Sequence, residues 1–91
     1  VMQSVCDYFN ITKEILLSRT RKRQIVQARQ IAMYLCRNRI NCSLSTIGNE
    51  IGGKDHATVL HACSTVNDLI ETDKLFRQYV SDIEKMLVSV N

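Results

Sequence analysis

Residues 52 to 66, GGKDHATVLHACSTV, hold the densest cluster of chemically useful side chains in this sequence. Two glycines, a lysine, an aspartate, two histidines and a cysteine fall within twelve residues. Such side chains could bind a metal ion, activate a nucleophile, hold a phosphate or begin a helix that contacts a partner. Their spacing is what separates these possibilities.

The spacing argues against metal binding and against nucleophilic catalysis. His56 and His61 are five residues apart, which places them about 140° apart around a helix. His61 and Cys63 are about 200° apart by the same geometry, and Cys63 falls on the apolar face, as a structural cysteine does. Because metal ligands must converge on one point, we expect no metal site, no catalytic residue and no enzyme.

The segment from Gly52 to Lys54 also differs from a phosphate loop. That motif needs GxxxxGK followed by Ser or Thr, after a strand. Here Asp55 follows the lysine and a helical pattern precedes the glycines. We interpret the glycines as a turn, because glycine tolerates the left-handed conformation in which helices commonly end.

Apolar residues recur at helical spacing through most of the chain, and no segment reads as a strand or an internal repeat. The sequence therefore predicts an all-α domain of about six helices. These are an amphipathic helix at 1–9, a short turn at 13–17 capped by Thr12, a long helix from 24 to about 38, a helix at 44–51 capped by Ser43, a helix capped by Asp55, and a last helix starting at Thr72 or Asp73. The core is expected to contain Ile25, Ala28, Ala32, Leu35, Cys36, Leu44, Ile47, Ile51, Val59, Ala62, Cys63, Val66, Ile70, Phe76, Val80, Ile83 and Leu87.

Length and composition predict one domain over residues 1–91. The chain has 91 residues, 45% of them hydrophobic, and no proline, which suits a small helical core. It opens with Val1, so we interpret it as a fragment of a longer protein. No apolar run approaches the length of about 20 residues that a membrane span requires. The four cysteines form no CxxC pair, and we expect them to be buried free thiols in a reducing cytoplasm.

Charge is distributed unevenly along the chain. The formal net charge is +3, but residues 13–54 hold nine Lys or Arg against two acids, a local charge of +7. Residues 55–91 hold three bases against six acids, a local charge of −3. A positive field confined to one part of a protein favours a polyanionic partner.

The predicted helix at 44–51, the glycine turn and the helix after Asp55 together form a helix-turn-helix pattern. In such units the start of the second helix contacts base edges in the major groove of DNA. From local pattern alone, Asp55 either only caps its helix or also accepts a hydrogen bond from a base. His56 is likewise either an exposed first residue or a donor to the groove.

The basic run RTRKR at residues 19–23 has two interpretations, a solvated surface loop or a phosphate contact. Four cations in five residues repel one another unless an anion is near. Arg29 and Arg37 lie farther along the next helix, about 80° apart around its axis. Three basic segments around a helix-turn-helix favour contact with phosphates.

The segment IGNEIGGKDHATVLHA (47–62) closely resembles the signature of the C-terminal DNA-binding domain, domain IV, of the bacterial replication initiator family DnaA. The segment SRTRKRQIVQARQIAMYL (18–35) resembles that family's basic loop and following helix, and VCDYFNITKEILLS resembles its entry helix. The resemblance covers essentially the whole chain. It implies sequence-specific binding of double-stranded DNA at nine-base-pair origin boxes of consensus TTATNCACA.

The resemblance also assigns residues. It implies that Arg21 enters the minor groove and that Asp55 and His56 contact base edges in the major groove. Ala57 stands where many members have Thr or Ser, so a methyl contact to thymine replaces any hydroxyl contact. Ser45 replaces a common proline, and Lys54 replaces arginine with the charge kept. Backbone contacts are implied for Arg19, Arg23, Arg29, Gln30, Arg37, Lys54, Thr58 and His61, and for Leu44 and Ser45 through main-chain amides.

Further expectations follow from the resemblance. ATP or ADP would bind a module upstream of this domain, so no cofactor is expected here. The isolated domain is expected to be a monomer in the cytoplasm, associated with the nucleoid, and the full-length protein to oligomerise on origin DNA. The alternatives are a helix-turn-helix transcription repressor of the Trp-repressor kind, or a helical module that binds an acidic protein partner.

Overall fold

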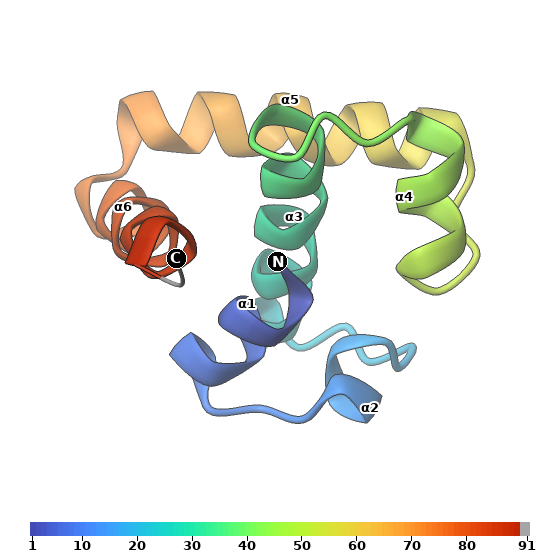
Figure 1. Cartoon of the computed structure of the whole chain (residues 1–91), viewed down its shortest axis with the longest axis horizontal. Helices are drawn as coiled ribbons and strands as arrows, with labels where there is room; N and C mark the ends of the chain where they lie inside the picture. Colours follow the sequence, from blue (N-terminus) through green and yellow to red (C-terminus); the bar gives the residue numbers. More distant parts are fainter. Residues whose placement is uncertain (90–91) are drawn as a thin grey trace.

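The computed structural model describes residues 1–89, and within that range the regular structure consists of six helices without a strand (Figure 1). The predicted all-α class and number of helices are therefore confirmed. The helices are α1 (Met2–Phe9), α2 (Lys13–Leu16), α3 (Arg23–Asn38), α4 (Leu44–Glu50), α5 (His56–Thr72) and α6 (Lys74–Ser89).

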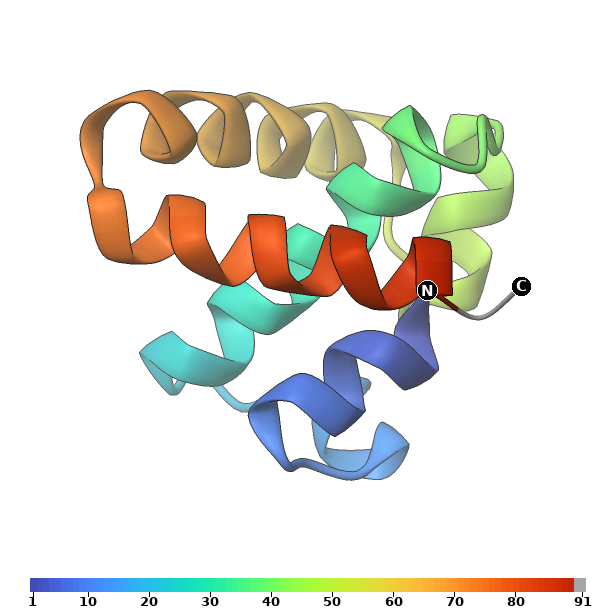
Figure 2. The same cartoon turned by 60° about the vertical axis from the view of Figure 1, so that its left-hand side comes forward.

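Helix α3 is the central element of the fold. It packs against α1, α2, α4 and α5, and Figure 1 places α4 and α6 on opposite sides of it. Ala28, Ile31, Ala32 and Leu35 have no exposed surface along this helix. Helix α5 crosses one end of α3, and α6 then turns back beside α5 (Figure 2). The apolar face of α3 thus fixes where every neighbouring helix can lie.

Each predicted N-cap makes its hydrogen bond. The side chains of Thr12, Ser43 and Asp55 accept from the main-chain amide three residues later, at 3.2, 3.1 and 2.8 Å. At the last helix, Asp73 rather than Thr72 is the cap, because its Oδ1 accepts from the amides of Leu75 and Phe76. Capping therefore sets the start of four of the six helices.

The predicted core is largely confirmed, with corrections at its edge. Cys36, Leu44, Cys63, Ile70 and Leu87 are only half-buried. Four of these five lie in the first or last turn of a helix, where the helix leaves the core. The expectation of four buried thiols is also wrong in part. All four cysteines are free, but Cys6 alone is buried and the others are half-buried.

No helix within residues 1–89 is long and apolar enough to cross a lipid bilayer.

The turn between α4 and α5 folds back onto α4 at Gly48. The amide of Lys54 donates to the Gly48 carbonyl at 2.8 Å, and a Cβ on Gly48 would overlap the carbonyl oxygen of Lys54. Gly52 and Gly53 have φ angles of 78° and 67°, in the region that glycine adopts without a steric penalty. The turn therefore needs glycine for two separate reasons, close approach at position 48 and backbone conformation at positions 52 and 53.

An aromatic cluster joins the first helix to the last. The ring of Phe9 packs edge-on against Tyr8 and Tyr79, with centroids 5.1 and 5.5 Å apart. The Tyr8 hydroxyl donates to Asp82 at 2.8 Å, and Gln78 donates to the other carboxylate oxygen at 2.6 Å. Burial and this hydrogen bond raise the pKa of Tyr8 to about 12. The cluster secures α6 against α1, on the side of α3 away from α4.

Replacing Gly48 by Ala should lower the free energy of unfolding by about 2 kcal/mol, because the added Cβ overlaps a main-chain carbonyl that cannot move alone. Helix propensity by itself predicts the opposite sign, a gain of about 1 kcal/mol. Denaturant unfolding followed by circular dichroism measures the change. Asn49→Ala, at the exposed neighbouring position of α4, is the matched control and should not destabilise. A more stable Gly48→Ala variant would contradict the close approach.

Replacing Tyr8 by Phe should lower the melting temperature at neutral pH, and the difference from wild type should shrink in acid. Hydrogen bonds from Tyr8 and Gln78 hold the pKa of Asp82 below its ordinary value. Such a carboxylate stabilises the fold above its unfolded pKa of about 4, and this contribution is lost as pH falls through the folded pKa. Thermal melts at about pH 7 and about pH 3 test this. An equal difference at both pH values would show that the Tyr8–Asp82 contact does not depend on the carboxylate charge.

Candidate nucleic-acid interface

The start of α5 presents polar groups to solvent. Asp55 Oδ1 accepts from the Thr58 amide, and hydrogen bonds from Thr58 hold the pKa of Asp55 below its ordinary value. His56 and Ala57 follow as the first two residues of the helix, so their amides have no intrahelical acceptor. The side chains of all four residues are exposed. This helix end therefore offers one carboxylate, one imidazole and two free main-chain donors to a partner.

Two adjoining surface hollows gather most of the residues assigned to the phosphate backbone. The smaller, about 140 Å³, lies between α3 and α5, and its polar lining is Arg29, Gln30, Lys54, Thr58 and His61. The larger, about 390 Å³, is lined by Arg19, Thr20, Arg21, Arg29, Gly52, Gly53 and Lys54. Arg29 and Lys54 line both hollows, so the two form one continuous surface from the basic loop to α5.

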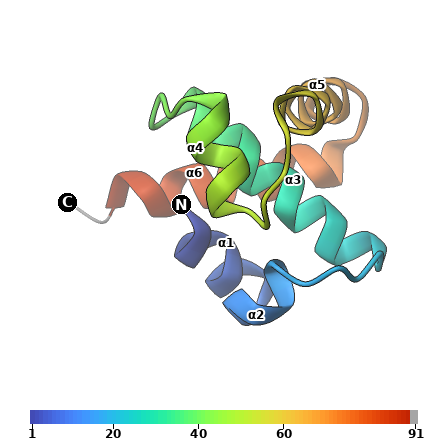
Figure 3. The same cartoon turned by 90° about the vertical axis from the view of Figure 1, so that its right-hand side faces the viewer.

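Tertiary packing brings the basic loop beside the helix-turn-helix. Both lie on the right-hand side in Figure 1, which faces the viewer in Figure 3. A Cβ on Gly52 would lie 3.7 Å from the Leu17 carbonyl, so the turn before α5 touches the end of α2. Arg19 and Arg21, which are far from Lys54 in sequence, therefore lie near it.

Within residues 1–89, the cations of this surface have no carboxylate partners. In the described part of the chain, the one ion pair joins Arg39 to Glu84 at 3.7 Å, away from the helix-turn-helix. Arg19, Arg21 and Arg23 are exposed, and Lys54 is half-buried. Unneutralised positive charges held close together attract an anion. The surface can therefore bind a polyanion such as a nucleic-acid backbone.

Arg29 differs from the other cations because it is buried. Its side chain is 8% exposed, and its Nε and Nη2 donate to the carbonyls of Leu16 and Thr20 at 2.6 and 2.8 Å. Burial lowers the pKa of its guanidinium from the ordinary value. The structure thus places Arg29 behind the basic loop, with two of its nitrogens already bonded.

A second group of candidate backbone contacts lies at the start of α4. Leu44 and Ser45 are the first two residues of this helix, so their amides also lack intrahelical acceptors. Arg37 Nη1 donates to the Cys42 carbonyl at 3.1 Å, which holds the Arg37 side chain beside the loop before α4. Arg23, in contrast, lines neither hollow, and the structure does not bring it together with the other candidates.

Leu60 belongs to the exposed face of α5 but was not assigned from the sequence. Its side chain is 52% exposed, and it lies three and four residues after Ala57 and His56. Residues at these spacings share one side of a helix. Val59 and Ala62, one residue before and two residues after it, are buried, so helical periodicity identifies Leu60 as an apolar residue that faces outward.

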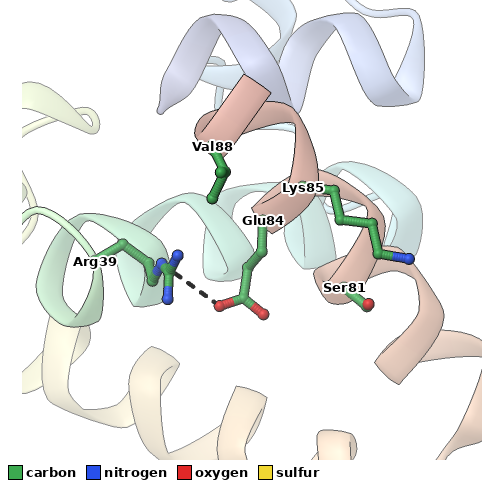
Figure 4. Close-up of a pocket in the computed structure, with 5 residues that line it drawn as sticks. All are labelled: Arg39, Ser81, Glu84, Lys85 and Val88. Atoms are coloured by element: carbon green, nitrogen blue, oxygen red, sulfur yellow. Dashed lines mark ion pairs between the residues drawn. The ribbon is translucent and has the colours of Figure 1, made fainter. Parts of the chain in front are cut away.

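A third hollow lies away from the helix-turn-helix. The hollow of about 410 Å³ between the end of α3 and α6 is lined by Arg39, Ser81, Glu84, Lys85 and Val88 (Figure 4). Its one charged pair spans 3.7 Å between partly exposed side chains. Within residues 1–89, no three His, Cys, Asp or Glu side chains lie close enough to hold a metal ion. Burial raises the pKa of the half-buried Cys63, which disfavours its thiolate.

Comparison with known proteins identifies relatives over nearly the whole chain. The chain is 52% identical to the chromosomal replication initiator protein DnaA of Flavobacterium psychrophilum over 87 residues, which is 96% of the chain and 18% of that protein. It is 49% identical to DnaA of Bacteroides thetaiotaomicron over 87 residues, again 96% of the chain and 18% of that protein. It is 46% identical to DnaA of Bacteroides fragilis over 91 residues, all of the chain and 19% of that protein.

The chain thus spans about a fifth of the length of the relatives it matches. Residues 1–66 match the family model of the bacterial DnaA protein helix-turn-helix. This range contains α4, the glycine turn and the start of α5, the elements that present the polar surface described above. The chain therefore belongs to the family of bacterial DnaA helix-turn-helix domains.

Proposed function

We propose that this chain is a sequence-specific, double-stranded DNA-binding domain that acts in the initiation of chromosomal replication. Its targets would be origin boxes of the TTATNCACA type. The observation that carries the proposal is the exposed start of α5 beside two hollows lined by cations that have no carboxylate partner within residues 1–89. A helix-turn-helix places this end of its second helix in the major groove.

Base recognition would be divided between the two grooves. Asp55 uses Oδ1 to cap α5, and the second carboxylate oxygen can accept from a base amino group. His56 would donate to a base edge in the same groove, and the Ala57 methyl would contact a thymine methyl. Arg21, from the basic loop, would enter the adjacent minor groove. These four exposed residues would supply most of the sequence preference.

Phosphate contacts would supply most of the affinity. Arg19, Gln30, Lys54, Thr58 and His61 line the two hollows, and the free amides of Leu44 and Ser45 and the side chain of Arg37 would contact the backbone at the start of α4. Main-chain donors at a helix N-terminus bind phosphate well because the helix dipole adds to their attraction. Arg23 would contribute from the exposed start of α3.

The remaining proposals concern the domain as a whole and the longer protein that contains such a domain in the chain's relatives. Residues 1–91 would form one domain that binds DNA as a monomer without a cofactor. ATP or ADP would bind elsewhere in a full-length protein, which would oligomerise on origin DNA. The protein would work in the cytoplasm, on the nucleoid. A dimeric footprint on paired half-sites would instead support a transcription repressor.

Binding to a box duplex should weaken steeply with salt. If about six phosphates are neutralised, log affinity should fall against log salt concentration with a slope of about −5. Fluorescence anisotropy at several salt concentrations measures the slope. A scrambled duplex should give weaker binding at every concentration. A slope near zero, or equal affinity for both duplexes, would contradict the proposed interface.

His56→Ala should weaken binding to the box by about 1–3 kcal/mol and leave binding to scrambled DNA nearly unchanged, because His56 contacts a base edge. His61→Ala, five residues farther along α5, is the matched comparison. It should weaken binding to both duplexes similarly, because His61 would contact phosphate. Anisotropy titrations at one salt concentration measure both. If His56→Ala weakened binding to both duplexes equally, His56 would not be a residue that contacts a base.

A further inference from the structure

The basic loop at residues 18–22 carries Arg21 but has little regular structure of its own. Neighbouring cations in the loop repel one another, and the loop lies outside the helices. A minor-groove contact by Arg21 is stronger when the loop already has the bound shape, since a mobile loop loses more entropy on binding. Contacts that hold this loop would therefore strengthen binding.

Thr20, directly before Arg21, makes three hydrogen bonds. Its carbonyl accepts from Arg29 Nη2 at 2.8 Å, and its amide donates to Ser18 Oγ at 3.4 Å. Its own hydroxyl accepts from the Lys22 amide at 3.4 Å. Of these bonds, the one from Arg29 is the shortest, and it alone connects the loop to the buried part of α3.

The Arg29 guanidinium joins two segments at once. Its Nε donates to the Leu16 carbonyl at the end of α2, at 2.6 Å, while Nη2 reaches Thr20 in the loop. A planar guanidinium presents these donors in a fixed fork, and hydrogen bonds from charged groups are stronger than neutral ones. The bond to the Leu16 carbonyl is buried, so water competes little for that carbonyl, and the bond to Thr20 is partly buried.

We propose that Arg29 is a positioning residue, which holds the basic loop in the shape that presents Arg21 to DNA, instead of acting mainly as a phosphate ligand. The proposal rests on the proposed function in one respect, that Arg21 contacts a base. The shape of the loop then depends on the two donors that the Arg29 guanidinium holds in one plane, and depends less on its positive charge. Lysine at this position keeps the charge but cannot hold both carbonyls in one plane.

Limited proteolysis without DNA tests the positioning role directly, because trypsin cleaves after the Arg and Lys residues of the loop. Arg29→Lys and Arg29→Met should each speed cleavage after Arg19, Arg21 and Lys22 about ten-fold, since the fork that joins the loop at Thr20 to the end of α2 at Leu16 is lost. Cleavage after Arg77, inside α6, serves as the reference for global unfolding. An unchanged rate at the loop would overturn the proposal. Equal acceleration at Arg77 would also count against it, because Arg29 would then support the whole fold.

The chain contains a matched control for this substitution. Arg77 also donates its Nε and Nη2 to two main-chain carbonyls, those of Ile70 and Glu71, at 2.6 and 3.3 Å. This second fork lies at the end of α5, away from the basic loop. Arg77→Lys makes the same chemical change and should leave both loop cleavage and DNA binding as in wild type.

DNA binding supplies the second readout. Arg29→Lys should reduce the preference for box over scrambled duplex about as far as Arg21→Ala does, and the double variant should lose little more than Arg21→Ala alone. If Arg29→Lys keeps the wild-type preference, the charge of Arg29 is sufficient and the proposal fails. If its loss adds fully to that of Arg21→Ala, Arg29 acts independently of Arg21 and the proposal also fails. If the wild-type protein showed no preference for the box duplex, the proposed function would be wrong. The proteolysis result would still show whether Arg29 holds the loop.

Discussion

The main-chain contact between the α4–α5 turn and Gly48 is the constraint on which the candidate interface depends. The Lys54 amide bonds to the Gly48 carbonyl at 2.8 Å, and no Cβ fits between the turn and the helix. This contact sets how α5 leaves α4. It therefore also sets where Asp55 and His56 face and how close Lys54 comes to the basic loop. A larger residue at position 48 would displace all of these groups together.

A second constraint is that the interface concentrates positive charge without neutralising it. Arg19 and Arg21 of the basic loop line the larger hollow, and Lys54 lines both. Within residues 1–89, the one ion pair lies elsewhere, between α3 and α6. Such an arrangement opposes folding through charge repulsion and is relieved when a polyanion binds. The apolar core around α3 must offset this repulsion in the free protein. The edge-on aromatic contacts between α1 and α6 add to that core from the opposite side.

Helical periodicity predicted the class, the six helices and most of the core, because each helix has one apolar face that alternates regularly with polar residues. The helix caps could also be predicted from the sequence, because the side chains of Thr12, Ser43 and Asp55 each accept from an amide only three residues later. The errors lie where the outcome depends on distant segments. Burial of Cys36, Ile70 and Leu87 was overestimated, because periodicity assigns a face without showing where the core ends. Asp73 was one of two candidate caps, and its bonds to the amides of Leu75 and Phe76 are as local as those of the other caps.

The sequence by itself determined the helix-turn-helix, the cap and exposed start of α5, and the positive segment, because each depends on neighbouring residues or on charge alone. The tertiary structure decided which of these come together. Arg19 and Arg21 share a hollow with Lys54 only because the turn at Gly52 packs against the end of α2. Arg29 lies behind the loop, bonded to two carbonyls, although the sequence analysis grouped it with the residues that contact phosphates. A side chain's partners across the fold are set by packing, which the spacing of residues along one helix does not specify.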